Sequence, residues 1–282
     1  MAVGTRVGWW LLERCSSERF PYRLQILKGE EPWLTLRVQD RWPAANRNIF
    51  CLRENEPPEP DEEREEVERV PVVALQRRGR RVSVVLDRMR YKRCDFLFLS
   101  KRYKERPNQD YEQIFWQTQQ SMRQRRPRAR LVSSGKAHGF TVRIAHEERY
   151  PWRFPGCGTT RGSLAGGDYA LADGDKVIAI VERKTFENFL SDLGVMPMLH
   201  QRLLELSAHK HHALVVEAPY EDFLDNRKVH HYTPAFCAAA VAEVYASHPG
   251  LRVVFCANRK TANEWTRNYF AAVWALAAES DT

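Results

Sequence analysis

The stretch 166-GGDYALADGDKVIAIVERKTFENFLSDL-193 decides how the C-terminal half of this 282-residue chain is expected to fold. Its centre, 177-VIAIV-181, is a continuous apolar run, which is typical of a central strand buried on both faces of a sheet. Apolar residues then recur at helical spacing over 186–193, so an amphipathic helix is expected directly after the strand. A buried strand followed at once by a helix predicts an α/β domain.

Charged residues stand at the end of this strand. Because side chains at i and i+2 of a strand share a face, Glu182 and Lys184 are expected to project together, with Arg183 on the opposite side. Asp168 lies 14 residues earlier, on a preceding strand, and can reach Glu182 across the turn. Two adjacent carboxylates repel each other unless a cation lies between them, and Mg²⁺ or Mn²⁺ prefers such oxygen ligands.

This D…ExK arrangement predicts metal-dependent phosphodiester hydrolysis, in which Lys184 orients an attacking water and the metal stabilises charge on the phosphate. On these residues alone, a salt-bridged strand end beside a turn aspartate is the alternative interpretation. The sequence on either side of these residues favours metal-dependent phosphodiester hydrolysis.

A GDY motif, a spacer, V-ERK and an amphipathic helix together resemble the nuclease domain of the XPF-type structure-selective endonucleases. The similarity runs from about 141 to 276, and it includes 147-EERYPWRFPGCGTTRGSLAGGDY-169 and the helix-and-strand segment 200–224. The resemblance implies a restriction-nuclease-like fold of the PD-(D/E)xK type, with a mixed central sheet flanked by helices, and Mg²⁺ or Mn²⁺ as the cofactor.

The resemblance also implies roles for individual residues. Asp168 and Glu182 would bind the metal, and Glu147 or Glu148 would supply a further acid. Lys184 would serve the nucleophilic water. Arg183 would either contact DNA phosphate or brace the site.

The chain departs from the family pattern at two positions. Ala145 stands where the family has an Asp, and Asn188 replaces the acid of the following helix, with Glu187 and Asp192 nearby. A second hypothesis is therefore a catalytically inactive nuclease-fold subunit that binds DNA or a partner nuclease or helicase. A third, an RNA-binding protein with an incidental motif, fits the basic charge alone.

The pattern of the chain predicts two domains. Residues 1–136 are expected to form a β-rich α+β domain, with a helix over 109–124 and two strands around the basic turn in 70–87. Residues 137–282 are expected to form the nuclease domain. Two of its helices have predicted starts, one at an N-cap Thr233 and one at a capping box from Thr261 to Glu264.

Charge is distributed unevenly along the chain, whose net charge is +8. Residues 71–136 hold 18 Lys and Arg against 5 Asp and Glu, whereas 54–68 hold 9 acids and 1 base. The acidic stretch is expected to be a flexible loop. Nucleic-acid contacts are predicted in a basic, aromatic-bearing loop and in the basic segment 121–136. These residues are Lys101, Arg102, Tyr103, Lys104, Arg123, Arg125, Arg126, Arg128 and Arg130.

The bulk sequence restricts the class of protein. No apolar run approaches the length of a membrane span, and the six cysteines are scattered without metal-binding spacing. We therefore expect an intracellular protein, in the cytoplasm or nucleoid of a bacterium or in the nucleus of a eukaryote. The expected partners are branched or partly single-stranded DNA, a second subunit in a homodimer or heterodimer, and a helicase.

Overall fold

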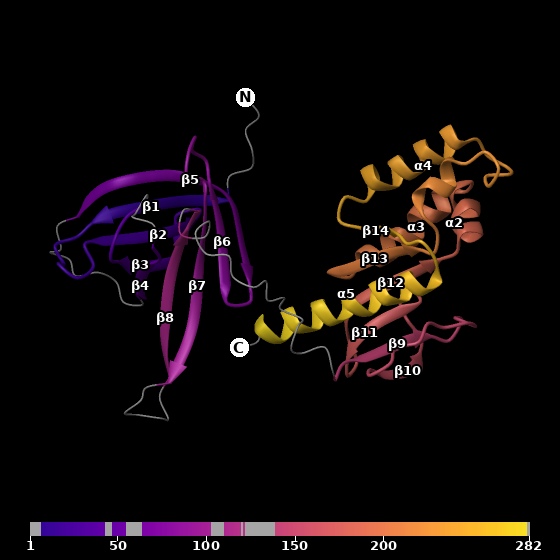
Figure 1. Cartoon of the computed structure of the whole chain (residues 1–282), viewed down its shortest axis with the longest axis horizontal. Coiled ribbons are helices and arrows are strands. Elements are labelled where there is room, and N and C mark those ends of the chain that lie inside the picture. Colours follow the sequence, from indigo (N-terminus) through magenta and orange to yellow (C-terminus); the bar gives the residue numbers. More distant parts are fainter. Residues whose placement is uncertain are drawn as a thin grey trace. The chain divides into compact units, whose positions relative to one another are not determined.

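The structure is a computed structural model that describes residues 7–42, 47–54, 64–102, 110–119, 121 and 139–280. The chain divides into two compact units, residues 1–129 and 130–282. The boundary predicted near residue 136 lies outside the described residues. Figure 1 shows the strands of the first unit in indigo to magenta and the elements of the second in rose to yellow.

The first unit is built on a closed, eight-stranded antiparallel barrel in the order β1-β2-β3-β4-β8-β7-β6-β5. Its strands are β1 (Gly8–Arg14), β2 (Tyr22–Lys28), β3 (Glu31–Val38), β4 (Ile49–Arg53), β5 (Glu65–Arg78), β6 (Arg81–Leu86), β7 (Arg93–Arg102) and β8 (Asp110–Thr118). Closure leaves no unpaired sheet edge in the barrel. The expectation of a β-rich first half is correct, although β1 was not predicted.

Aromatic side chains fill the centre of the barrel. Trp10, Phe96 and Trp116 are all fully buried, and the Trp10 ring centroid lies 6.1 Å from that of Phe96 and 5.2 Å from that of Trp116. Inward residues alternate with outward ones along each strand, as the period of a strand requires. The interior is therefore a packed hydrophobic core.

The helix predicted over 109–124 is wrong, because residues 110–118 form strand β8. Ile114, Trp116 and Thr118 are buried and alternate with half-buried neighbours. Phe115, which the helical spacing had placed on the apolar face, instead points outward and packs against Phe50 on β4. Pairing of β8 with β4 and β7 overrides the local pattern, as tertiary context does with weak propensities.

The loop predicted over 54–68 is wrong at both ends. β5 begins at Glu65, and the Glu54 side chain forms ion pairs with Arg23 and Arg37 on neighbouring strands. Residues 55–63 lie outside the described residues.

The second unit contains a mixed six-stranded sheet in the order β10-β9-β11-β12-β13-β14. Its strands are β9 (Thr141–Ala145), β10 (Gly158–Gly162), β11 (Tyr169–Asp173), β12 (Lys176–Lys184), β13 (His211–Val216) and β14 (Arg252–Phe255). β11 is antiparallel to β9 and β12, whereas β12, β13 and β14 run parallel. The central position predicted for β12 is confirmed, and β10 lies at one edge of the sheet.

Helices cover both faces of this sheet. The apolar residues of α2 (Phe186–Leu193), α3 (Met196–Ser207), α4 (Pro234–Ser247) and the short 3₁₀ helix η2 (Tyr220–Leu224) pack with Ile180 of β12. Residues from α5 (Arg259–Ser280) pack with Ala179 and Val181 from the other face. Figure 1 shows α5, in yellow, running along the sheet, and α2, α3 and α4 grouped at the upper right of the view. The coarse prediction of a mixed α/β unit is confirmed.

The starts of two helices test the capping predictions. Thr233 caps α4 as predicted, since its side chain accepts the Phe236 N–H. The capping box predicted from Thr261 to Glu264 is wrong, because α5 begins at Arg259. Asn258 caps it, and its side-chain oxygen accepts the N–H groups of Lys260 and Thr261 at 2.9 and 3.1 Å. No helix in the described part of the chain is long and apolar enough to span a membrane.

Candidate functional site

A polar pocket of about 280 Å³ lies at the C-terminal end of β12. Four segments contribute to it: the loop after β9, the residue before β11, the end of β12 and the start of α2. Its lining residues are Glu147, Glu148, Arg149, Asp168, Glu182, Arg183, Lys184, Thr185 and Asn188. Every residue predicted from the sequence as catalytic or metal-binding is in this set.

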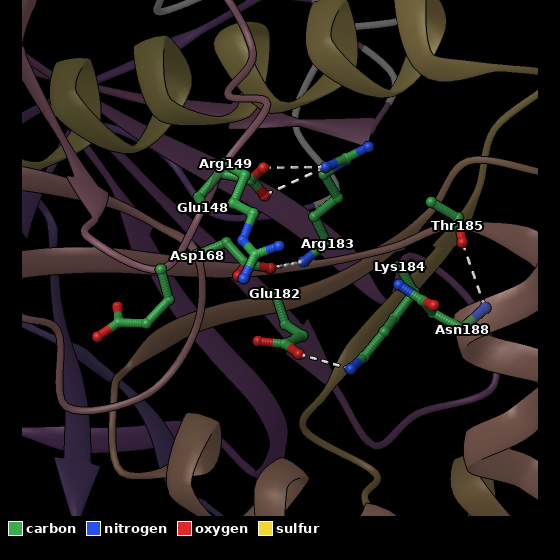
Figure 2. Close-up of a pocket in the computed structure, with 9 residues that line it drawn as sticks. Glu148, Arg149, Asp168, Glu182, Arg183, Lys184, Thr185 and Asn188 are labelled. Carbon is green, nitrogen blue, oxygen red and sulfur yellow. Dashed lines mark hydrogen bonds and ion pairs between the residues drawn. The ribbon is translucent and has the colours of Figure 1, made fainter.

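Strand register brings Asp168 to Glu182. The Asp168 N–H donates to the Val181 carbonyl at 2.9 Å, one residue before Glu182. One side-chain oxygen of Asp168 accepts the backbone N–H of Arg183 at 2.7 Å. Figure 2 shows this bond between Asp168 and Arg183 beside the Glu182 side chain. The predicted meeting of the two carboxylates is confirmed.

Asp168 occupies a site that disfavours its negative charge. Burial and then the nearby carboxylate of Glu182 raise its pKa to about 7, and Glu148 adds to the rise. The Arg183 N–H and the charge of Lys184 act in the opposite direction without cancelling the effect. The pocket therefore favours the neutral form of Asp168 more than an exposed position would.

Lys184 is held between two carboxylates. Its ammonium nitrogen lies 2.9 Å from Glu182 Oε1 and 2.9 Å from Asp192 Oδ2. Burial opposes the charge, but Glu182 and Asp192 outweigh it and raise the pKa of Lys184. Lys184 is therefore a fixed cation on the same face as Glu182, as the strand pattern predicts.

Arg183 projects to the other face and forms the centre of a buried brace. Its guanidinium donates to both oxygens of Glu217, at 2.8 and 3.0 Å, and to Glu148 at 3.1 and 3.2 Å. Trp152 Nε1 also donates to Glu217, at 2.7 Å. Burial disfavours the Arg183 charge, but its hydrogen bonds to Glu217 and the negative charges of Glu217 and Glu148 raise its pKa above the usual range. Of the two roles implied for Arg183, these contacts match bracing.

Residues 128–269, half of the chain, match the model of the ERCC4 domain. The chain belongs to the ERCC4 domain family. This confirms the XPF-type resemblance and makes the chain a member of a family of DNA nucleases.

Two solved structures similar to this ERCC4-domain chain are XPF from Aeropyrum pernix alone and in complex with DNA. Both are 24% identical, with TM-scores of 0.37 and 0.38. The alignments cover 46% and 48% of this chain, and 59% and 65% of the Aeropyrum chains. This chain therefore spans less than two thirds of those proteins. No curated protein matches significantly.

The ERCC4 domain of this chain contains two acids whose importance the sequence did not reveal. Glu217 follows β13 and accepts hydrogen bonds from Arg183, Trp152 and, at 3.5 Å, Arg259. Asp192 lies one helical turn beyond Asn188 and contacts Lys184. The only sequence signal for Glu217 was an acid at the end of an apolar strand.

Other predicted contacts fall outside the pocket or outside the described chain. Lys101 and Arg102 are exposed at the end of β7, where Arg102 lies 3.8 Å from Asp110. Tyr103, Lys104 and the five arginines predicted between 123 and 130 lie outside the described residues.

Gly167 is expected to be essential for placing Asp168. Its φ is +69°, and an added Cβ would lie 2.8 Å from Ile180 Cγ1 and 3.1 Å from the Val181 carbonyl oxygen. Gly167→Ala is therefore expected to destabilise the protein by about 2–4 kcal/mol, because left-handed strain adds to a clash with the buried Ile180 side chain. Chemical denaturation measures this loss.

Gly174→Ala is the matched control, since Gly174 has a φ of +56° but an added Cβ would meet nothing within 4 Å. It is expected to cost about 1–2 kcal/mol, from the backbone conformation alone. Equal losses in the two variants would contradict the importance of the close approach at Gly167.

Proposed function

We propose that this chain is a divalent-metal-dependent DNA endonuclease whose site is formed by Asp168, Glu182 and Lys184. Family membership supports the nuclease class. The observation that carries the site is the crowding of Asp168 and Glu182 in one pocket beside a fixed lysine. A pocket that serves only structure gains nothing from two repelling carboxylates.

The donor set of the pocket fits Mg²⁺ or Mn²⁺. In the described part of the chain, no group of three or more His, Cys, Asp and Glu is arranged to hold a metal ion. Mg²⁺ is nevertheless often held by one or two carboxylates, with water and substrate phosphate supplying the other ligands. Asp168 and Glu182 would hold the ion, while Glu148 is committed to Arg183. When bound, the metal would stabilise negative charge developing on the scissile phosphate.

The protein's own residues would position the reactants. Lys184, fixed by Glu182 and Asp192, would orient a water for in-line attack on phosphorus. The Arg183 N–H fixes one oxygen of Asp168. The Arg183 side chain would keep Glu148 and Glu217 in place behind the site.

Arg149 would receive the substrate phosphate. Among the described residues that line the pocket, Arg183 and Lys184 are ion-paired, whereas the exposed Arg149 has no ion-pair partner. An unpaired guanidinium can bind phosphate without first breaking an internal contact.

Arg149→Gln is expected to weaken DNA binding roughly tenfold or more, since a hydrogen bond to a charged group contributes about 1.5–3 kcal/mol. Binding is measured by fluorescence anisotropy without metal. Arg153→Gln removes an exposed arginine of the same segment that does not line the pocket, and it is expected to change binding less. If the two variants behaved alike, Arg149 would have no special role.

The decisive test is a cleavage panel. Single-stranded, duplex, flap, fork and four-way DNA are each incubated with the full chain and Mg²⁺, Mn²⁺ or chelator. We expect cleavage with either metal, a preference for the branched substrates, and no cleavage with chelator.

DNA binding without cleavage under all conditions would instead support the second candidate, an inactive nuclease-fold subunit. Ala145 and Asn188, which replace two family acids, favour that candidate. The DNA structure preferred, a dimeric state and a helicase partner are parts of the proposal that rest on the resemblance.

A further inference from the structure

The hairpin between β5 and β6 carries a dense group of arginines that the nuclease pocket does not use. Arg77 and Arg78 end β5, Gly79 turns the chain with a φ of +54°, and Arg80 and Arg81 begin the return. All four arginine side chains are exposed. We call these four residues the arginine hairpin.

Strand register places two of these cations directly opposite each other. Arg78 pairs with Arg81 across the hairpin, and like charges in directly opposed positions of a sheet are destabilising. Their contacts are mainly to neutral groups: Arg78 donates to Ser83 Oγ at 3.1 Å and Arg81 to Gln117 Oε1 at 2.6 Å. This repulsion is relieved if an external anion binds between them.

Few acids neutralise the hairpin. Among the described residues, its one ion pair joins Arg81 to Asp95 at 3.6 Å. Arg77 donates to the Gly79 carbonyl at 3.4 Å, and Arg80 has no ion-pair partner. A solvated surface of mixed charge would be expected to pair most of these arginines with acids, as Arg53 is paired with Glu112 at 2.8 Å.

The barrel topology extends the basic surface beyond the hairpin. The Phe98 N–H donates to the Arg80 carbonyl at 2.8 Å, and β7 continues past this point to Arg102. The exposed Lys101 and Arg102 therefore lie at the same end of the barrel as the arginine hairpin. Arginines of the hairpin and cations about twenty positions later in the sequence thus share one rim of the barrel, where Arg102 lies 3.8 Å from Asp110.

We propose that the arginine hairpin, together with Lys101 and Arg102, binds the phosphate backbone of nucleic acid. Guanidinium groups match phosphate with two parallel hydrogen bonds, and an exposed two-stranded ribbon has dimensions that the major groove of DNA accepts. The inference rests on the proposed function for its ligand, DNA, and assigns the first unit to substrate binding.

The experiment measures binding of a fork DNA to the full chain carrying Glu182→Gln, so that cleavage does not interfere. Arg77, Arg78 and Arg80 are changed together to Gln, which leaves the Arg81–Asp95 pair intact. The matched control changes Arg90, Lys92 and Arg93 to Gln, because these residues are also exposed on the first unit and the variant loses the same charge. Anisotropy is recorded over a range of KCl concentrations.

The hairpin variant is expected to bind roughly tenfold or more weakly, and its plot of log affinity against log salt should be shallower by about one to three units. The control variant should change affinity by less than half as much on the logarithmic scale. Unchanged thermal midpoints verify folding. Equal losses in both variants, no loss in the hairpin variant, or equally effective competition by polyglutamate would overturn the proposal.

This experiment separates the two proposals. If the hairpin variant loses binding but the unmodified chain never cleaves DNA, the proposed nuclease activity fails and the phosphate-binding surface stands. If the unmodified chain cleaves DNA and the hairpin variant binds DNA normally, the proposed phosphate-binding surface fails and the proposed nuclease activity stands.

Discussion

Arg183→Met is expected to destabilise the second unit by about 3–5 kcal/mol, the usual cost of removing one partner from a buried ion pair. The side chains of Glu148 and Glu217 are each 8% exposed, and both bond the Arg183 guanidinium. Methionine fills part of the space but leaves the buried Glu148 without a cation, and Glu217 with only Arg259, at 3.5 Å. Chemical denaturation of the full chain, followed by intrinsic tryptophan fluorescence, measures the loss.

Arg202→Met provides the control for this prediction. The Arg202 side chain is 50% exposed and lies 3.3 Å from Asp192, and exposed pairs contribute only about 0–1 kcal/mol. Combining Arg183→Met with Glu148→Gln and Glu217→Gln should recover part of the lost stability, because the unpaired charges are removed. A stable Arg183→Met protein that had lost DNA binding would instead identify Arg183 as a phosphate contact.

Glu182→Gln is expected to lower the rate of DNA cleavage by about a thousandfold or more while leaving DNA binding nearly unchanged. Loss of a charge that acts on the transition state commonly has an effect of this size. The substitution keeps the side-chain shape, and glutamine Oε1 can still accept from Lys184. Single-turnover cleavage with Mg²⁺ and metal-free anisotropy measure the two properties separately.

Glu221→Gln serves as the charge control, since Glu221 is an exposed acid of η2 that does not line the pocket. It should leave both properties unchanged. Cleavage by Glu182→Gln at the unmodified rate would show that the pocket is not the nuclease site.

Much of the second unit could be predicted because its signals are local. The apolar run 177–181 predicts a central strand, and period two places Glu182 and Lys184 on one face of it. The helical spacing after Thr185 predicts α2. Each of these inferences needs only the residues within one element, and each is confirmed.

The failed prediction of a helix over 109–124 concerns a segment whose structure depends on distant partners. Residues 110–118 show helical spacing, but pairing with β4 and β7 makes them a strand. The Thr261 capping box was also a plausible local signal. α5 instead begins two residues earlier than Thr261. Asn258 caps it, because its side-chain oxygen accepts the N–H groups of Lys260 and Thr261.

The sequence by itself determined three residues of the pocket, because Asp168, Glu182 and Lys184 belong to one strand-turn-strand segment whose short turn between Asp173 and Lys176 pairs its two strands. Only the tertiary structure decided the partners of these residues. Glu217 is 34 residues from Arg183, and Asp192 reaches Lys184 because α2 folds back beside β12. Such contacts depend on how separate elements pack against each other, and the periodicity within one element does not predict that packing.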